Sequence, residues 1–536
     1  MPRPLGPVGA PAGAIRSALP HAAGVEASAW SNGWQNAARW SAAPAHALLL
    51  LIGATAVLRL VIADMMGLGI DESYMVAAGR HLQLSYFDHP PLSWWLAWGA
   101  AQLFGSETGF VVRLPFIALF ALSTWLMYRL GEVLFSSRAG LWAAVAFNCA
   151  PIFGVTTASW VLPDGPLDCA LLGATLCLVR ALPSGNRRWW IGFGVCSGLA
   201  LLSKYTAVLS MAGIGLYLLT QPGDRRWLLR FEPYAAALIA IGLFAPVLIW
   251  NAQHDWISFA FQGGRAGGAR LHPFGPFVAL AGEALFLLPW IWLALMAVLV
   301  KAVRSGPARS GEWLLCCLGA VPIVVFSVIA LWSNSRIAFH WAAPGYLMLF
   351  PLLGRAVEAS LDRGERFARF WLTGTAILVS SAFLLVASEV RWNWLPEIGE
   401  QFTAGNDPVL AAVDWTSLGT QLAERNLVDS GTPAIATIRW YDAGKLDYAL
   451  GGAVPVICLG NDPRQYGIAA SADRFRDSNV LIVAPRTTLA EMTARFGPMF
   501  AEIEALPPLT LVHGGYDAMT IPLFRGKGLL RPPSSY

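Results

Sequence analysis

Long apolar runs dominate the middle of this chain. A helix needs about 20 mostly apolar residues to cross a membrane. Runs of about that length occur at 46–64, 110–130, 139–158, 166–182, 232–250, 276–300, 312–332, 341–356 and 370–390. A longer run at 189–220 is interrupted at Ser203, Lys204 and Tyr205, which predicts two short helices joined by a tight turn. The pattern therefore predicts an all-α polytopic membrane domain with about eleven transmembrane helices.

One apolar segment is too short to span. Residues 91–104 contain Trp94, Trp95 and Trp98, and they follow the prolines at 90 and 91. Proline fits the first turn of a helix, and tryptophan favours the headgroup zone. We expect an interfacial helix here.

The pattern changes at both ends of the chain. After Arg391 the apolar runs shrink to strand length, at Ala434 to Ile438, Val454 to Cys458 and Val480 to Ala484, and helical patterns at 442–450 and 488–496 alternate with them. This alternation predicts a small α/β domain over 391–536. Residues 1–45 are rich in Ala, Gly, Pro and Ser, which predicts a disordered tail before a membrane domain at 46–390, with no cleavable signal peptide evident.

Charge sets the expected orientation. Hydrophobic residues make up 56% of the chain and charged residues 13%, with a net charge of +4 that gives no support for a nucleic-acid partner. With the N-terminus inside, most Arg and Lys residues between the spans fall in cytoplasmic loops, which is the positive-inside pattern. The tail is then cytoplasmic and the α/β domain extracytoplasmic. The seven cysteines show no zinc-ligand or disulfide spacing, so we expect them to pack as small apolar residues.

Ionisable residues gather on the outer side. The first outer loop contains Asp71-Glu72-Ser73-Tyr74 and then Asp88-His89-Pro90-Pro91. Other outward ends carry Asp164, Asp168, Lys204, Arg336 and His340. Ionisable groups at the ends of spans are costly to bury and often mark functional sites. This one-sided collection predicts a site for an anionic ligand.

These residues carry a family resemblance. The segment from Asp71 to Pro115, with Asp-Glu, His-Pro-Pro-Leu, Phe-Gly and Arg-Leu-Pro, resembles the first outer loop of GT-C fold glycosyltransferases of family 39. Bacterial members of that family resemble the protein O-mannosyltransferases and the lipid A aminoarabinose transferase. Further matches are Pro163-Asp164, Leu202-Ser203-Lys204-Tyr205 and the segment 336–344 with His340-Trp341. The resemblance covers about residues 46–390.

The resemblance implies an activity and a set of roles. Members take a sugar from a polyprenyl-phosphate carrier at the outer membrane face and invert the anomeric centre. Asp71 matches the general base, and Glu72 is expected to support it. The expected donor-phosphate residues are His89, Lys204, Arg336 and His340, and the expected sugar or acceptor residues are Tyr74, Asp88, Asp164, Tyr205, Trp341 and Tyr441. The aminoarabinose transferase branch has lysine where this chain has His89, and this departure weakens the carry-over of that branch's phosphate geometry and acceptor.

Each residue also has an ordinary structural explanation. A hydrated loop acid or a helix N-cap accounts for Asp71 and Asp164, and Glu72 can simply face water. A histidine that caps a helix at the interface accounts for His89 and His340. Membrane anchoring accounts for the aromatic residues.

The resulting hypothesis is an inverting glycosyltransferase of the bacterial inner membrane, with its site open to the periplasm. The expected donor is a polyprenyl-phosphate-linked hexose or pentose, the expected acceptor a hydroxyl of lipid A, another envelope glycan or lipid, or a protein. No divalent metal is predicted. The alternatives are a multi-pass transporter and a non-catalytic binding protein for lipid-linked sugars. A transporter is expected to place its polar residues near the midplane.

Overall fold

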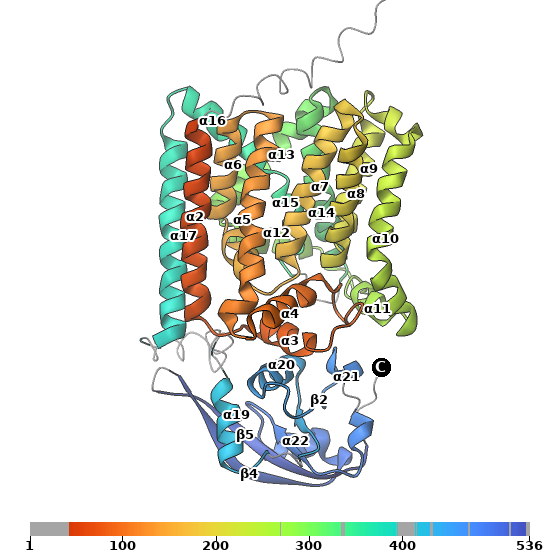
Figure 1. Ribbon diagram of the computed structural model, residues 1–536, viewed down its shortest axis with the longest axis vertical. Coiled ribbons are helices and arrows are strands. Elements are labelled where there is room, and N and C mark those ends of the chain that lie inside the picture. The colour runs from red at the N-terminus through yellow and green to blue at the C-terminus, as the bar shows by residue number, and fades with distance from the viewer. Residues whose placement is uncertain are drawn as a thin grey trace, which may run out of the picture.

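The computed structural model has two parts, a helical bundle and a smaller domain with a β-sheet at one end of it (Figure 1). The structure describes residues 42–268, 270–333, 338–392, 394, 413, 415–428, 432–469, 472–513 and 516–531. The predicted tail at 1–45 lies almost entirely outside these residues.

The bundle is built from the predicted apolar runs. Within the described residues, seven helices are long and apolar enough to cross a membrane: α2 (Ala42–Met65), α5 (Gly109–Leu134), α7 (Asp164–Ser184), α10 (Phe231–Gln253), α13 (Pro289–Ser305), α14 (Ser310–Ile329) and α17 (Phe367–Trp392). Shorter helices complete it: α6 (Ser137–Cys149), α8 (Arg187–Ser203), α9 (Ala207–Thr220), α12 (Gly275–Leu287), α15 (Ala343–Leu347) and α16 (Phe350–Asp362). The chain is therefore a multi-pass membrane protein.

Three predicted runs are broken helices. The run at 276–300 divides into α12 and α13 at Leu288, because its φ of 72° is incompatible with a right-handed helix. The run at 341–356 divides into α15 and α16. The run at 139–158 passes from α6 into a π-helical turn, Ile152–Thr157. Nη2 of Arg59 donates to the carbonyl of Gly154 in this turn at 2.9 Å, which satisfies a polar group that lipid could not.

Three short helices lie across the end of the bundle that faces the smaller domain: α3 (Ile70–Gly79), α4 (Leu92–Phe104) and α11 (Ile257–Gly264) (Figure 1). Helix α4 confirms the short helix expected at 91–104. Helix α3 corrects the loop expected around Asp71. Its ten residues mix polar and apolar positions, so no hydropathy signal distinguishes it from a loop.

The smaller domain contains a five-stranded sheet in the order β2-β1-β3-β5-β4. The strands are β1 (Ile435–Thr437), β2 (Val456–Cys458), β3 (Val480–Val483), β4 (Phe500–His513) and β5 (Tyr516–Leu529). Strand β1 pairs in parallel with β2 and β3, and β5 pairs antiparallel with β3 and β4. Helices α19 (Thr416–Glu424), α20 (Trp440–Ala449), α21 (Tyr466–Ala469) and α22 (Leu489–Phe496) accompany it. The three predicted strands and the α/β class are confirmed, whereas the long β4–β5 hairpin was not predicted.

The two parts share one apolar core. Buried side chains of α3 and α4, such as Tyr74 and Trp94, belong to the same cluster as Leu446 of α20 and Leu481 of β3. Helices α3 and α20 approach so closely that a Cβ on Gly444 would lie 2.7 Å from the Cα of Tyr74. The smaller domain is therefore docked directly on the helix that carries Asp71.

Candidate active site

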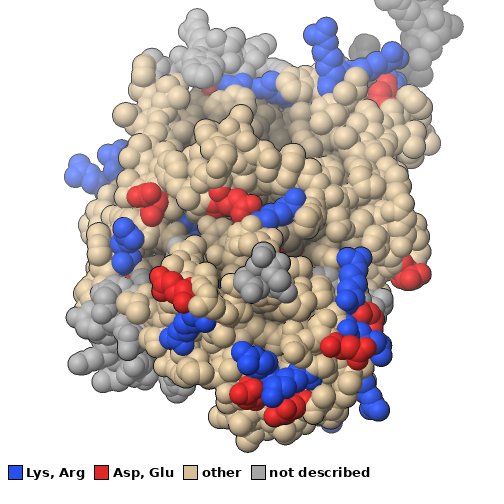
Figure 2. Space-filling view, turned by 60° about the horizontal axis from the view of Figure 1, so that its bottom comes forward, with Lys and Arg blue, Asp and Glu red and all other residues tan. Residues whose placement is uncertain are grey.

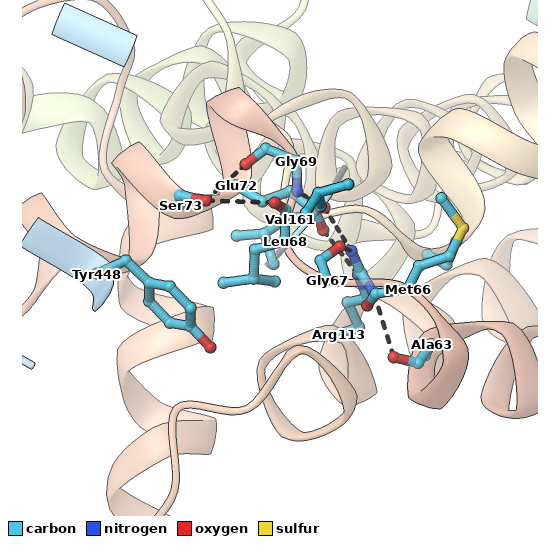
Figure 3. Close-up of polar contacts among 12 residues, drawn as sticks. Ala63, Met66, Gly67, Leu68, Gly69, Glu72, Ser73, Arg113, Val161 and Tyr448 are labelled. Atoms are coloured by element: carbon cyan, nitrogen blue, oxygen red, sulfur yellow. Dashed lines mark hydrogen bonds and ion pairs between the residues drawn. The ribbon is translucent and has the colours of Figure 1, made fainter. Parts of the chain in front are cut away.

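A buried ion pair fixes the start of α3. Nε and Nη2 of Arg113, on α5, donate to the two carboxylate oxygens of Glu72 at 2.8 and 2.6 Å, and both side chains are no more than 3% exposed. The remaining Arg113 donors reach the carbonyls of Ala63, Met66 and Gly67 (Figure 3). The amides of Gly69 and Val161 donate to Glu72 at 2.8 and 3.0 Å. Burial alone would raise the pKa of Glu72, but Arg113 and these amides hold it below its ordinary value.

This network gives Glu72 a structural position. A carboxylate that accepts four hydrogen bonds has no free oxygen for a substrate. It joins the end of α2, the start of α3, α5 and the segment before α7. The sequence showed Arg113 only as the arginine of the Arg-Leu-Pro motif, with no sign that it is the partner of Glu72.

Asp71 is the exposed neighbour of this pair. Asp71 is exposed as a residue, although Glu72 beside it is buried. Protein packed around Asp71 raises its pKa to about 6; Arg464 lowers it, whereas Asp88, Glu72 and Asp164 raise it further. Asp71 is thus a carboxylate that a ligand can reach, held in the first turn of a helix by a rigid support.

A second buried ion pair lies at the ends of two spans. Nζ of Lys204, at the C-terminus of α8, lies 2.8 Å from Oδ1 of Asp164, at the N-terminus of α7. Both side chains are less than 10% exposed. Because Asp164 acts on the pKa of Asp71, the two carboxylates belong to one charged cluster. We call the groups around them the outer cluster: Asp71, Asp88, His89, Asp164, Lys204, Arg265, His340 and Arg464.

The two histidines of the outer cluster are neutral at pH 7. Burial lowers the pKa of His89 to about 4, and Lys204 and Arg464 lower it further while Asp88 and Asp164 oppose them. Burial likewise lowers the pKa of His340 to about 4, with Lys204 and Arg265 acting in the same direction. Within the described residues, Nδ1 of His89 is buried without a hydrogen-bond partner. The cationic role expected for both histidines becomes that of neutral hydrogen-bond donors or acceptors.

Arg265 is a cation of the outer cluster that is absent from the residues predicted from the sequence. Its guanidinium lies 4.7 Å from the ring of Trp341, next to His340, and 5.4 Å from the ring of Phe261. In the part of the chain that the structure describes, it forms no ion pair. Only the folding of the 257–267 segment against the 338–341 segment brings it to the cluster, so the sequence carried no local signal.

Other predicted residues are already engaged by protein. The hydroxyl of Tyr74 donates to Asp88 at 3.2 Å, Arg464 donates to the other oxygen of Asp88 at 3.1 Å, and both Tyr74 and Asp88 are at most 2% exposed. The hydroxyl of Tyr205 lies 2.7 Å from that of Ser258. Tyr441 is half-buried on α20, with Arg439 over its ring at 5.7 Å. Arg336 lies outside the described residues.

The outer cluster offers recessed cations rather than a charged surface. Figure 2, which brings the smaller domain forward, shows acidic and basic side chains interspersed with tan surface. No group of three or more His, Cys, Asp or Glu residues in the described ranges could hold a metal ion. The arrangement supplies one accessible carboxylate, a buried lysine, a half-buried arginine and two neutral imidazoles.

The chain is similar to known proteins in sequence and in fold. A family model described as dolichyl-phosphate-mannose-protein mannosyltransferase matches residues 88–250. The lipid A galacturonosyltransferase RgtD of Rhizobium johnstonii is 24% identical over 218 residues, which are 40% of this chain and 44% of that protein, so the chain matches less than half the length of that relative.

Solved structures match over more of the chain. ArnT from Cupriavidus metallidurans in the apo state has a TM-score of 0.61 at 16% identity and covers 91% of this chain and 100% of its own. The same protein bound to undecaprenyl phosphate has a TM-score of 0.62 at 16% identity and covers 90% of this chain and 99% of its own. The predicted fold class, a helical membrane domain followed by a small α/β domain, is confirmed.

Proposed function

We propose, from the premise that this chain has the fold of the GT-C glycosyltransferases, that it transfers a sugar from a polyprenyl-phosphate carrier to an acceptor hydroxyl with inversion. The observation that carries the proposal is the outer cluster, in which accessible Asp71 shares an electrostatic environment with Asp164 and Lys204. The ArnT structure with undecaprenyl phosphate supports a lipid-phosphate donor, and the RgtD relative, a lipid A galacturonosyltransferase, supports sugar transfer.

Asp71 is the proposed general base. It accepts the proton of the acceptor hydroxyl as the oxygen bonds to the anomeric carbon and the bond from that carbon to the phosphate oxygen breaks. A single displacement of this kind inverts the anomeric centre. Base catalysis requires a positioned carboxylate in its ionised form. The Glu72–Arg113 pair supplies the positioning, so Glu72 supports Asp71 structurally and does not touch the substrate.

Lys204 and Arg265 are the proposed partners of the carrier phosphate. Negative charge grows on the phosphate as the glycosidic bond breaks, and cations fixed near it stabilise the transition state. His89 and His340 are proposed as neutral donors to the same group, and Arg336 remains a proposed phosphate residue. Asp164 holds Lys204 in place.

Sugar and acceptor contacts are proposed for Tyr205, Trp341 and Tyr441, which are half-buried near the outer cluster. The contacts of Tyr74 and Asp88 favour an anchoring role instead. The proposed setting is the bacterial inner membrane with the site facing the periplasm, supported by the arginine-rich loops at the other ends of the spans. Lipid A, another envelope glycan or lipid, and a protein remain the proposed acceptor classes.

A deletion strain tests the proposal. Mass spectrometry of its envelope lipids and glycans is expected to show the loss of one sugar mass, restored by the wild-type gene and not by Asp71→Asn or Lys204→Gln. Restoration by both variants at normal protein levels would contradict the assignment. If the chain were a transporter, Asp71→Asn would still move the lipid-linked donor, because transport does not use a base, and the donor would not accumulate. This alternative is not favoured, since the ionisable groups lie at one end of the spans.

A further inference from the structure

The smaller domain reaches into the outer cluster. Arg464 and Gln465 precede α21, and each contacts residues of the membrane domain that lie more than 370 positions earlier in the chain. Nη1 of Arg464 donates to Asp88 at 3.1 Å. The amide of Gln465 donates to the hydroxyl of Tyr74 at 3.1 Å, and its side-chain oxygen accepts from the amide of Phe87 at 2.9 Å.

These bonds connect α3, which carries Asp71, to the 86–89 turn, which carries His89, through the 464–465 segment of the smaller domain. Tyr74 lies three positions after Asp71, which places the two on neighbouring rows of α3. Asp88 directly precedes His89. The hydroxyl of Tyr74 also donates to Asp88, so α3 and the 86–89 turn meet at the point where Arg464 enters. Gln262 of α11 donates to the carbonyl of Asp88 and closes the arrangement from another side.

Arg464 is held in a specific pose. Its guanidinium lies 3.6 Å from the ring centre of Trp440, which is a close cation–π contact. Its φ of 49° is a left-handed conformation that a non-glycine residue adopts only when its surroundings impose it. A residue fixed in this way by its own domain presents a preset charge to the membrane domain.

We propose that the smaller domain completes the active site through Arg464, which acts as a positioning residue that fixes the Asp71 helix against the His89 turn and sets the charge balance at Asp71. The proposal rests on the proposed function for its consequence in catalysis. The smaller domain then has a role in positioning the active site, in addition to packing against the membrane domain.

The groups that face Asp71 define the electrostatic consequence. They are Arg464 from the smaller domain, Asp88 from the 86–89 turn, Glu72 from α3, Asp164 from α7 and Arg265 from the segment after α11. Arg464 favours ionised Asp71, whereas Asp88 disfavours it. Removal of the two charges must therefore move the titration of Asp71 in opposite directions, which loss of packing cannot do.

The experiment measures the titration of Asp71 without any substrate. The purified full-length protein in detergent is treated with a water-soluble carbodiimide and an amine over a range of pH, and mass spectrometry follows labelling of the peptide that contains Asp71. Only the protonated carboxyl reacts, so the midpoint of labelling reports its pKa. Arg464→Gln is expected to raise the midpoint by roughly half a pH unit or more, and Asp88→Asn to lower it by a similar amount.

Controls separate charge from folding. Arg476→Gln removes an exposed arginine of the same domain, paired with Asp473 at 3.3 Å, and is expected to leave the midpoint unchanged. Arg464→Lys keeps the charge and is expected to stay close to the wild-type midpoint. Equal midpoints in the wild type, Arg464→Gln and Asp88→Asn, or shifts in one direction in both variants, would overturn the proposal. Because no donor is used, this outcome is independent of whether Asp71→Asn abolishes transfer.

Discussion

Nζ of Lys204 lies 2.8 Å from Oδ1 of Asp164, and the two side chains are only 6% and 9% exposed. The pair joins the end of α8 to the start of α7 at the end of the bundle that carries Asp71. A buried lysine already paired with a carboxylate is held in place before a ligand arrives, so little reorganisation is needed when a phosphate binds.

Lys204→Gln is expected to weaken the binding of undecaprenyl phosphate. A hydrogen bond to a charged group contributes about 1.5–3 kcal/mol, which corresponds to a loss of roughly ten- to a hundredfold in affinity. Titration of the detergent-solubilised protein with undecaprenyl phosphate measures it. Lys301→Gln, on an exposed lysine of α13, is the matched control. Equal affinities of the Lys204 variant and the wild type would remove Lys204 from the phosphate site.

The Glu72–Arg113 pair is expected to govern stability. Removing one partner of a buried ion pair leaves the other charge uncompensated, at a cost of about 3–5 kcal/mol. Glu72→Gln and Arg113→Met are therefore each expected to lower the unfolding temperature sharply, while Glu365→Gln, in an exposed pair with Arg363, has no measurable effect. Thermal unfolding in detergent measures all three. An unfolding temperature of the Arg113 variant equal to that of the wild type would show that the pair is dispensable for stability.

Transfer is expected to depend on pH through Asp71. Its pKa is raised to about 6, chiefly because protein packs around it. The base must be ionised, so the rate is expected to fall as the pH drops through about 6 and to level off above it. His89 and His340 titrate near 4 and stay neutral over this range. A rate that rises as the pH falls from 7 to 5 would point to a protonated group instead.

The contact between α3 and α20 is expected to be intolerant of side chains. A Cβ at position 444 would lie 2.7 Å from the Cα of Tyr74 and 2.8 Å from its Cβ, so Gly444→Val must separate the helices. We expect faster proteolysis between the two parts and loss of transfer. Gly451→Ala provides a control. The added Cβ meets no atom within 4 Å, so any effect comes from the strain of an alanine at a φ of 62°. Wild-type protease resistance of the Gly444 variant would contradict the docked arrangement.

The sequence predicted the elements that hydropathy encodes. Apolar runs located the spans and the three short strands because burial in lipid or in a sheet requires such runs. It missed α3, a ten-residue helix of mixed polar and apolar residues, and the β4–β5 hairpin, where Pro507 and Pro508 interrupt a half-exposed strand that has no clean alternation. The breaks at Leu288 and after α15 depend on tertiary packing, so apolarity alone predicted continuous helices there.

The sequence predicted which residues gather at the candidate site, but not the contacts that they make there. Asp71, Asp164 and Lys204 gather at one end because topology alone brings helix ends together. The engagement of Glu72 by Arg113, and of Asp88 by Arg464, is set by contacts across 41 and 376 positions. No local pattern records such distances, so Glu72 was expected to support the base and Asp88 to contact the sugar or acceptor, although Arg113 and Arg464 already hold them. The neutral state of the two histidines follows from burial, which the sequence did not show.

The most direct test of the account compares transfer by the wild type and by Asp71→Asn. The purified full-length proteins receive lipid-linked sugar donor extracted from the organism's own membranes, and both are titrated with undecaprenyl phosphate. Loss of a general base predicts a fall in transfer of about 10²–10⁴-fold, with carrier binding unchanged. Transfer by the variant at the wild-type rate would contradict the central claim that Asp71 takes the acceptor proton.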